Sequence, residues 1–160
     1  MNDDARFEDA GEGALALGAE TPEDVEVVST LLQDAVGQTS DVAWARAHRR
    51  FSLLLGRFRW EDRARAEAAG RPYERVRAVL SVDDVLRVRA MGIDPADRDT
   101  VFSVLSLAFT PGADGAGTLT IILAGDGAIA LDVECINLRL QDVTRPYAAP
   151  SGKAPEHDDV

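Results

Sequence analysis

The chain has 160 residues, 46% of them hydrophobic, and carries a formal net charge of −11, with 28 acidic against 17 basic residues. This length and composition predict one packed domain and argue against general disorder. The overall acidity argues against nucleic-acid binding, and no apolar run approaches the roughly 20 residues that span a bilayer.

Acidic and proline-containing segments bound the predicted domain. Residues 1–12 are acidic and contain glycine, whereas residues 145–160 contain three prolines with serine, glycine and aspartate. Both are predicted to be mobile tails, which leaves a single domain over 13–144. The acidic start has no apolar stretch behind it, and a single cysteine excludes an intrachain disulfide. We therefore expect a cytoplasmic protein.

A short strand is predicted at 13–18, followed by one helix over 22–35. Thr21 suits the N-cap of this helix and Pro22 its first position. Five apolar residues recur at helical spacing: Val25, Val28, Leu31, Leu32 and Ala35. Such a stripe predicts a helix that packs on another element.

The rest of the chain shows the alternation of apolar and polar residues that is typical of strands. The predicted strands are 38–45, 50–60, 74–81, 85–91, 101–110, 118–124 and 128–142. These elements predict an α+β fold, mainly antiparallel β: a curved sheet or split barrel of about seven strands with one N-terminal helix packed on it.

Turn residues and face parity predict two hairpins. A three-residue loop over 125–127, with Gly127 free to take a positive φ, places Leu123 opposite Ile129, Ile121 opposite Leu131, and Leu119 opposite Val133. A loop over 82–84 joins 74–81 to 85–91. It places Val76, Ala78 and Leu80 inside with Leu86, Val88 and Ala90, and sets Arg77 directly opposite Arg89 outside.

Two strands change parity along their length, which predicts a bulge in each. In 50–60 the inward series passes from Leu55 to Phe58 and Trp60 at Gly56. In 128–142 the inward series passes from Cys135 to Ile136, so Cys135 is expected to be buried and unreactive. Bulges bend strands and favour a curved sheet.

The most distinctive pattern is three pairs of arginines, each spaced by two residues within a strand. The pairs are Arg57 and Arg59, Arg75 and Arg77, and Arg87 and Arg89. Because side chains alternate along a strand, each pair shares one face. All six residues are expected on the outer surface of the sheet, where they are candidates for binding an anion or a partner. The stretch from Arg46 to Arg89 contains twelve arginines and six acidic residues, so the basic charge is concentrated there.

The alternative is that these arginines form ion pairs within the protein. Like charges directly opposite each other destabilise a sheet, so Arg77 and Arg89 need a counter-charge. The acidic residues at hand are Glu61, Asp62, Glu74, Asp132 and Glu134. The sequence does not choose between an ion-pair network and an anion-binding face.

Other residues carry weaker signals. Trp60 continues an apolar series, Trp44 is a candidate for a partly exposed aromatic residue, and His48 lies in a polar turn. Two separated histidines and one cysteine offer too few ligands for a zinc site, so no metal or cofactor is expected. No set of residues typical of nucleophilic or acid–base catalysis can be assembled.

Three strings resemble the bacterial family called domain of unknown function 2948. They are residues 32–36 (LQDAV), residues 50–61 (RFSLLLGRFRWE) and residues 131–136 (LDVECI). The resemblance covers approximately 13–144 and implies a bacterial cytosolic domain, but it carries over no activity or site.

The sequence therefore predicts a non-enzymatic module that binds an unknown protein or a small anion through the arginine-rich face. The alternative is a small anionic metabolite bound in a barrel-mouth pocket or under the helix, with Arg57 or Arg59 as a bidentate donor. An enzyme is the third and least favoured interpretation. Neither nucleic acid nor a membrane is expected as a partner.

Overall fold

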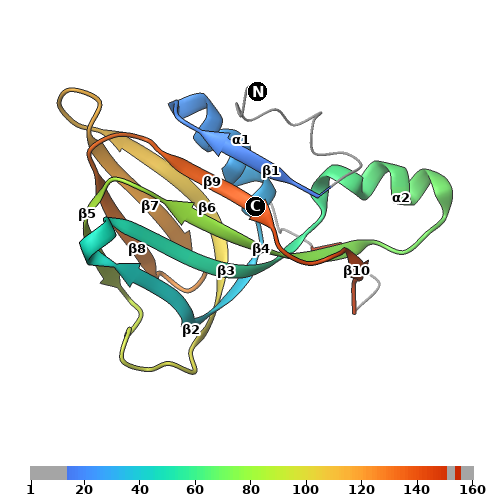
Figure 1. The fold of residues 1–160 in the computed structure, drawn as a ribbon. Helices are drawn as coiled ribbons and strands as arrows, with labels where there is room; N and C mark the ends of the chain where they lie inside the picture. The colour runs from blue at the N-terminus through green and yellow to red at the C-terminus, as the bar shows by residue number, and fades with distance from the viewer. Residues whose placement is uncertain (1–13, 151–153, 156–160) are drawn as a thin grey trace.

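The computed structural model describes residues 14–150 and 154–155. The predicted tail at 1–12 lies outside the described residues, as do 151–153 and 156–160. The described chain forms an α+β fold in which ten strands build one antiparallel sheet (Figure 1). The strands are β1 (Ala16–Ala19), β2 (Val36–Ala45), β3 (Arg50–Phe58), β4 (Glu74–Val82), β5 (Val85–Met91), β6 (Val101–Pro111), β7 (Gly117–Leu123), β8 (Ala128–Val133), β9 (Leu138–Asp142) and β10 (Tyr147–Ala148). The helices are α1 (Pro22–Leu32) and α2 (Arg63–Ala69).

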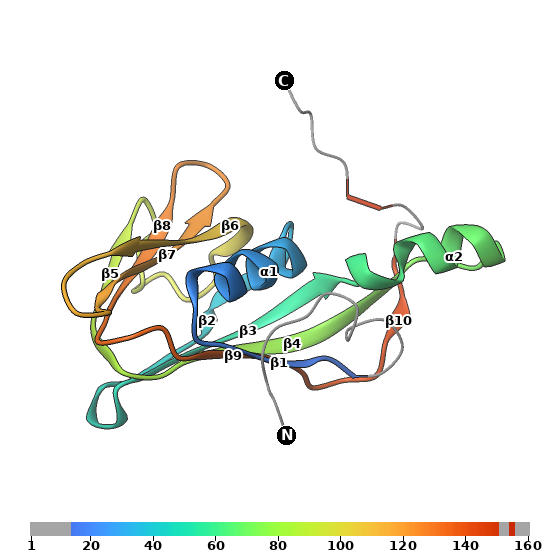
Figure 2. The same cartoon turned by 90° about the horizontal axis from the view of Figure 1, so that it is seen from above.

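The sheet is strongly curved and open. Its strand order is β1-β9-β4-β3-β2-β6-β7-β8-β5, with β10 added beside β4. One half holds β5 to β8 and the other holds β1, β9, β4 and β3, with β2 pairing to β6 between them (Figure 2). The α+β class is confirmed, but the sheet is not closed into a barrel, and seven strands with one helix were too few.

Helix α1 closes one end of the space between the two halves. Thr21 Oγ1 accepts a hydrogen bond from the Asp24 amide at 3.2 Å, which confirms the predicted N-cap. The apolar stripe is buried as predicted and packs mainly against β6 and β1 (Figure 2). The helix ends at Leu32, three residues earlier than predicted, and Asp34 has a positive φ of 62°. Neither helix among the described residues is long and apolar enough to cross a membrane.

The hairpin of β7 and β8 has the predicted faces but a different register. Leu119 lies opposite Leu131 and Ile121 opposite Ile129, a shift of two residues from the predicted pairs. The reason is that the turn begins one residue earlier: the Leu123 amide donates to the Gly127 carbonyl at 2.8 Å, and Gly125 and Asp126, not Gly127, have positive φ angles of 82° and 67°. A shift of two keeps every side chain on its face.

The predicted hairpin of β4 and β5 is wrong. β4 pairs with β3 and β9, whereas β5 pairs with β8 in the other half of the sheet. Arg77 therefore lies opposite Gly56, and Arg89 lies opposite Ala130. The chain leaves β4 at Asp83 and crosses to the other half, so the short connection is a crossing point and not a hairpin turn.

Neither predicted bulge is present as such. β3 pairs with β4 in unbroken register from Phe51 to Phe58, so Arg57 continues the inward series. Phe58 is buried on the other face, where the rings of Trp60 and Tyr73 pack against it at 4.7 and 5.6 Å. The predicted strand over 128–142 breaks into β8 and β9, and Cys135 between them is exposed, contrary to the prediction.

Candidate functional site

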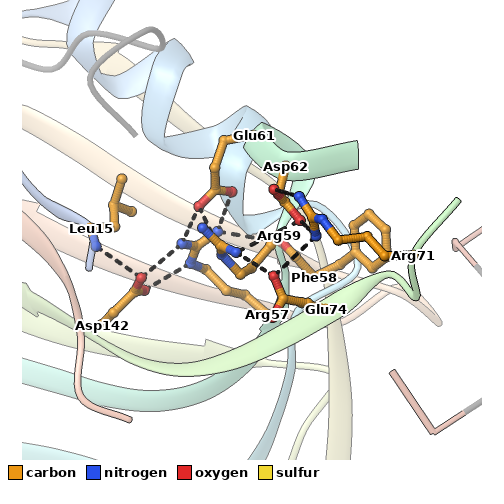
Figure 3. A network of polar contacts seen from close by, with 9 residues as sticks. All are labelled: Leu15, Arg57, Phe58, Arg59, Glu61, Asp62, Arg71, Glu74 and Asp142. Carbon is orange, nitrogen blue, oxygen red and sulfur yellow. Dashed lines mark hydrogen bonds and ion pairs between the residues drawn. The ribbon is translucent and has the colours of Figure 1, made fainter. Parts of the chain in front are cut away.

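The structure separates the six candidate arginines into three groups, of which the first is buried. Arg57 is fully buried, which corrects the expectation that it lies on the outer face. Its guanidinium donates two hydrogen bonds to Glu61, at 2.8 and 2.7 Å, and two to Asp142, both at 3.1 Å (Figure 3). Asp142 also accepts the Leu15 amide at 2.9 Å.

Arg59 belongs to the same cluster and is also buried, with 5% of its surface exposed. Its Nη1 lies 2.6 Å from Glu74 and 3.7 Å from Asp62. Arg71, which follows α2, donates two hydrogen bonds to Asp62 (Figure 3). Sequence reasoning missed both α2 and Arg71, although Arg63–Ala69 is rich in the strong helix formers alanine and arginine.

These charges compensate one another within the protein. Three guanidinium groups face four carboxylates: Glu61, Asp62, Glu74 and Asp142. Burial alone lowers the pKa of Arg57, but its hydrogen bonds and attraction to Glu61 and Asp142 outweigh this and raise the pKa. The cluster therefore has no free cation for an anionic ligand, and its role is to tie β3, β9, β4 and α2 together.

The second group lies on β5, in the other half of the sheet. Arg89 pairs with Asp132 of β8 at 2.7 Å, and Thr118 donates a second hydrogen bond to the same carboxylate at 3.0 Å. Arg87 stands directly opposite Asp132 in the strand register. Burial tends to raise the pKa of Asp132, but the bonds from Arg89 and Thr118 and the charge of Arg87 lower it overall. Asp132 is thus the counter-charge for this pair.

The third group, Arg75 and Arg77 on β4, lines a groove on the outer face of the sheet. Arg75 is half-buried and donates to the Gly56 carbonyl at 3.0 Å, and Arg77 is exposed. Among the residues that the structure describes, no carboxylate forms an ion pair with either side chain. Burial lowers the pKa of Arg75, and the nearby Tyr147 and Asp34 offset this only in part. Arg75 is therefore a partly desolvated cation without a full counter-charge.

The groove has a volume of about 330 Å³ and opens above Gly56. A side chain at Gly56 would project into it without a clash, because its Cβ would lie 3.9 Å from the Val36 carbonyl oxygen and 4.0 Å from the Tyr147 hydroxyl oxygen. Tyr147 comes from β10, whose backbone pairs with β4 at Arg75. The groove thus brings two guanidinium groups and a phenol together.

Apolar side chains and one acid complete the groove. Val36 and Val101 line it and are 41% and 64% exposed. Asp41 also lines it, beside Leu54 on the neighbouring strand. Sequence reasoning missed Tyr147 because it lies in the segment read as a tail, and a two-residue strand leaves no periodic signal.

The family model described as "Protein of unknown function (DUF2948)" matches residues 15–157. The chain belongs to this family. The resemblance drawn from the three sequence strings is therefore confirmed, and the match extends past β9 to include Tyr147. No curated protein and no solved structure matches the chain.

The titratable side chains do not point to a metal centre. Within 14–150 and 154–155, no group of three or more His, Cys, Asp or Glu side chains is arranged to hold a metal ion. His48 is exposed in a 3-10 turn over Arg46–His48, as the polar composition of that turn suggested. The candidate site is therefore the groove of Arg75, Arg77 and Tyr147.

Proposed function

We propose that this domain is a binding module that holds the carboxylate or phosphate of its ligand between Arg75 and Arg77. The observation that carries the proposal is a pair of neighbouring guanidinium groups that open into a groove without an ion pair to any described carboxylate. Planar guanidinium groups bind carboxylate and phosphate oxygens through paired hydrogen bonds.

The energetics of the groove support an anionic ligand. Arg75 and Arg77 lie on one face of β4, so their like charges repel each other. An anion between them relieves this repulsion and supplies the counter-charge that the partly desolvated Arg75 lacks. The Tyr147 hydroxyl adds a third hydrogen-bond donor.

The lining suggests what the rest of the ligand is like. The exposed Val36 and Val101 favour an apolar group next to the anion. Asp41 in the lining disfavours a polyanion, which agrees with the net charge of −11 in arguing against nucleic acid. A small phosphate ester or carboxylate, or a protein segment with an acidic residue beside an apolar one, presents this chemistry.

Calorimetric titration with phenyl phosphate tests the proposal. Saturable binding is expected for the unmodified protein. The affinity of the double variant Arg75→Gln, Arg77→Gln is expected to be lower by a factor of about ten or more. The matched control is Arg87→Gln, which removes an exposed strand arginine from the other half of the sheet and is expected to change nothing. Equal binding by the double variant and the control would refute the site.

Two further titrations distinguish the sources of the anion. An acetylated Leu-Glu-Leu peptide represents a protein segment, and benzoate represents a small carboxylate without a peptide backbone. A peptide that binds more tightly than benzoate indicates a protein partner, and the reverse order indicates a small molecule. If phenyl phosphate, benzoate and the peptide all fail to bind, the proposed function is refuted.

A further inference from the structure

A second hollow lies on the inner side of the sheet, where its two halves fail to meet. It is a cavity of about 310 Å³ between β2 and β3 on one side and β5 and β8 on the other. This volume is at the lower end of the range of roughly 300–1,000 Å³ that is typical of small-molecule sites. The groove of Arg75 and Arg77 shares no lining residue with it.

The cavity exists because the curved sheet does not close. β2 pairs with β6 only from Val36 to Gln38, and its pairing with β3 shifts register between Gly37 and Val42. β5 pairs with β8 alone and forms the end of the sheet. Most side chains that face the gap are apolar, and several of them are only partly buried, among them Val42, Trp44 and Val88. Water in contact with such a surface is displaced favourably by an apolar ligand.

The segment from residue 92 to 100 covers the cavity on one side. It connects β5 to β6, at the bottom of Figure 1, and contributes Ile93, Pro95 and Arg98 to the lining. Its attachment to β2 is specific, since the Thr39 amide donates to the Thr100 carbonyl at 2.9 Å and the Ser40 amide to the Arg98 carbonyl at 3.1 Å. The Thr39 hydroxyl adds a hydrogen bond to the Asp97 carbonyl.

Arg98 is the charged residue in this lining. Its guanidinium makes a long hydrogen bond of 3.5 Å to the Ser40 carbonyl, and within the described part of the chain no carboxylate forms an ion pair with it. Asp94 and Asp97 lie on the same segment, and their carboxylates accept backbone amides at 2.9 and 3.3 Å. Asp99 lies there as well, so Arg98 is accompanied by three aspartates on this segment, none of which lines the cavity.

We propose that this cavity binds a small, mainly apolar monocarboxylate, with its hydrocarbon part against Trp44 and Val88 and its carboxylate at Arg98. A single arginine suits one carboxylate, and the negative charge of the three aspartates on the same segment disfavours ligands with more negative charge. This site is distinct from the groove in its place in the fold and in its lining residues.

The test uses 4-phenylbutyrate and its uncharged match, 4-phenylbutanol, titrated into the full chain and followed by the NMR signal of the Trp44 indole. Arg98→Gln is expected to weaken binding of the acid about tenfold and to leave the alcohol unchanged. The control Arg145→Gln changes an exposed arginine that lines neither hollow, and it is expected to leave the response of Trp44 to both probes unchanged.

Cavity-filling variants complete the experiment. Val88→Phe is expected to abolish binding of both probes, and Ala90→Leu, at an exposed lining position, serves if Val88→Phe does not fold. The proposed cavity site is refuted if neither probe shows saturable binding. It is also refuted if a cavity-filling variant that folds still binds the probes as the unmodified protein does. The carboxylate assignment is refuted if Arg98→Gln weakens the acid and the alcohol equally. Phenyl phosphate binding at the groove is a separate result that none of these outcomes changes.

Discussion

Arg57 and Asp142 lie 85 residues apart in the chain, yet two hydrogen bonds of 3.1 Å join them inside the folded sheet. Both side chains are almost fully buried, with exposed fractions of 0% and 1%. Asp142 also accepts the Leu15 amide, so one carboxylate fixes β3, β9 and the segment before β1 relative to one another. Buried charges of this kind contribute little net stability when they are intact, but removing one partner leaves the other uncompensated.

Asp142→Ala is therefore expected to lower the free energy of unfolding by about 3 kcal/mol, because Arg57 keeps only Glu61 as a counter-charge. Urea denaturation of the variant and the unmodified protein measures this. The control Glu134→Ala breaks the exposed ion pair with Arg49 and is expected to cost less than about 1 kcal/mol. Equal losses in the two variants would show that burial of the Arg57 pair carries no special weight.

The pH dependence of stability is expected to show the effect of Arg71 on Asp62. The hydrogen bonds from Arg71, helped by the charges of Arg59 and Arg71, hold the pKa of Asp62 below its usual range. The unfolded chain has the ordinary, higher pKa and binds more protons between the two values, so this stabilisation is complete above the ordinary value and is lost as the pH falls through the folded value.

Arg71→Gln removes the main cause of the shift. The difference in unfolding free energy between the unmodified protein and this variant is expected to shrink as the pH is lowered from about 6 to about 2. Urea denaturation at a series of pH values measures the difference. For the control Arg145→Gln, an exposed arginine beyond β9, the difference stays constant; a constant difference for Arg71→Gln as well would contradict the role of Asp62.

Substitution by alanine at two glycines on neighbouring strands is expected to have different effects on stability. A Cβ at Gly37 would lie 2.8 to 2.9 Å from the side chains of Phe102 and Leu55, whereas one at Gly56 meets nothing closer than 3.9 Å. Gly37→Ala is expected to cost about 1–3 kcal/mol through overpacking. Gly56→Ala is expected to change stability by less than about 0.5 kcal/mol, yet to weaken phenyl phosphate binding by narrowing the groove. Thermal and urea unfolding with the phosphate titration check both; a destabilising Gly56→Ala would contradict the open groove floor.

Cys135 is exposed but is expected to react slowly with thiol reagents at neutral pH. Burial of the sulfur atom and its hydrogen bond to Asp84 raise the pKa of the thiol, so little thiolate is present. The rate of modification by a disulfide reagent is expected to rise with pH, and this rise is expected at higher pH than for an unperturbed cysteine. Asp84→Asn is expected to speed the reaction at neutral pH, and an unchanged rate would exclude Asp84 as a cause.

Local patterns predicted the parts of the fold that depend on neighbouring residues. Thr21 and the apolar stripe are sufficient to define α1, because capping and helical period act within a few residues. The faces of β7 and β8 were also correct, since Leu119 and Leu131 alternate with polar residues whatever the length of the turn. The register was wrong because the position of the turn depends on φ angles at Gly125 and Asp126 that composition does not fix.

The site depended on contacts that no local pattern contains. Arg57 was predicted to lie outside because the apolar series of the sequence changes at Gly56 to Phe58 and Trp60. Its burial depends on Glu61 and on the approach of Asp142 from a distant strand. β4 and β5 look like a hairpin from 74 to 91, but each finds its partner elsewhere. Arg75 and Arg77 were correctly read as an outward pair, whereas Tyr147, Arg98 and the cavity required the tertiary structure.

The position of β9 has a consequence for synthesis on the ribosome. β9 separates β1 from β4, so Ala16–Ala19 finds its strand partner only after Leu138–Asp142 has emerged. The guanidinium of Arg57 likewise waits for the carboxylate of Asp142. A nascent chain that stops short of β9 therefore holds an unpaired first strand and an incompletely neutralised interior charge, so co-translational folding of this half of the sheet must await the synthesis of β9.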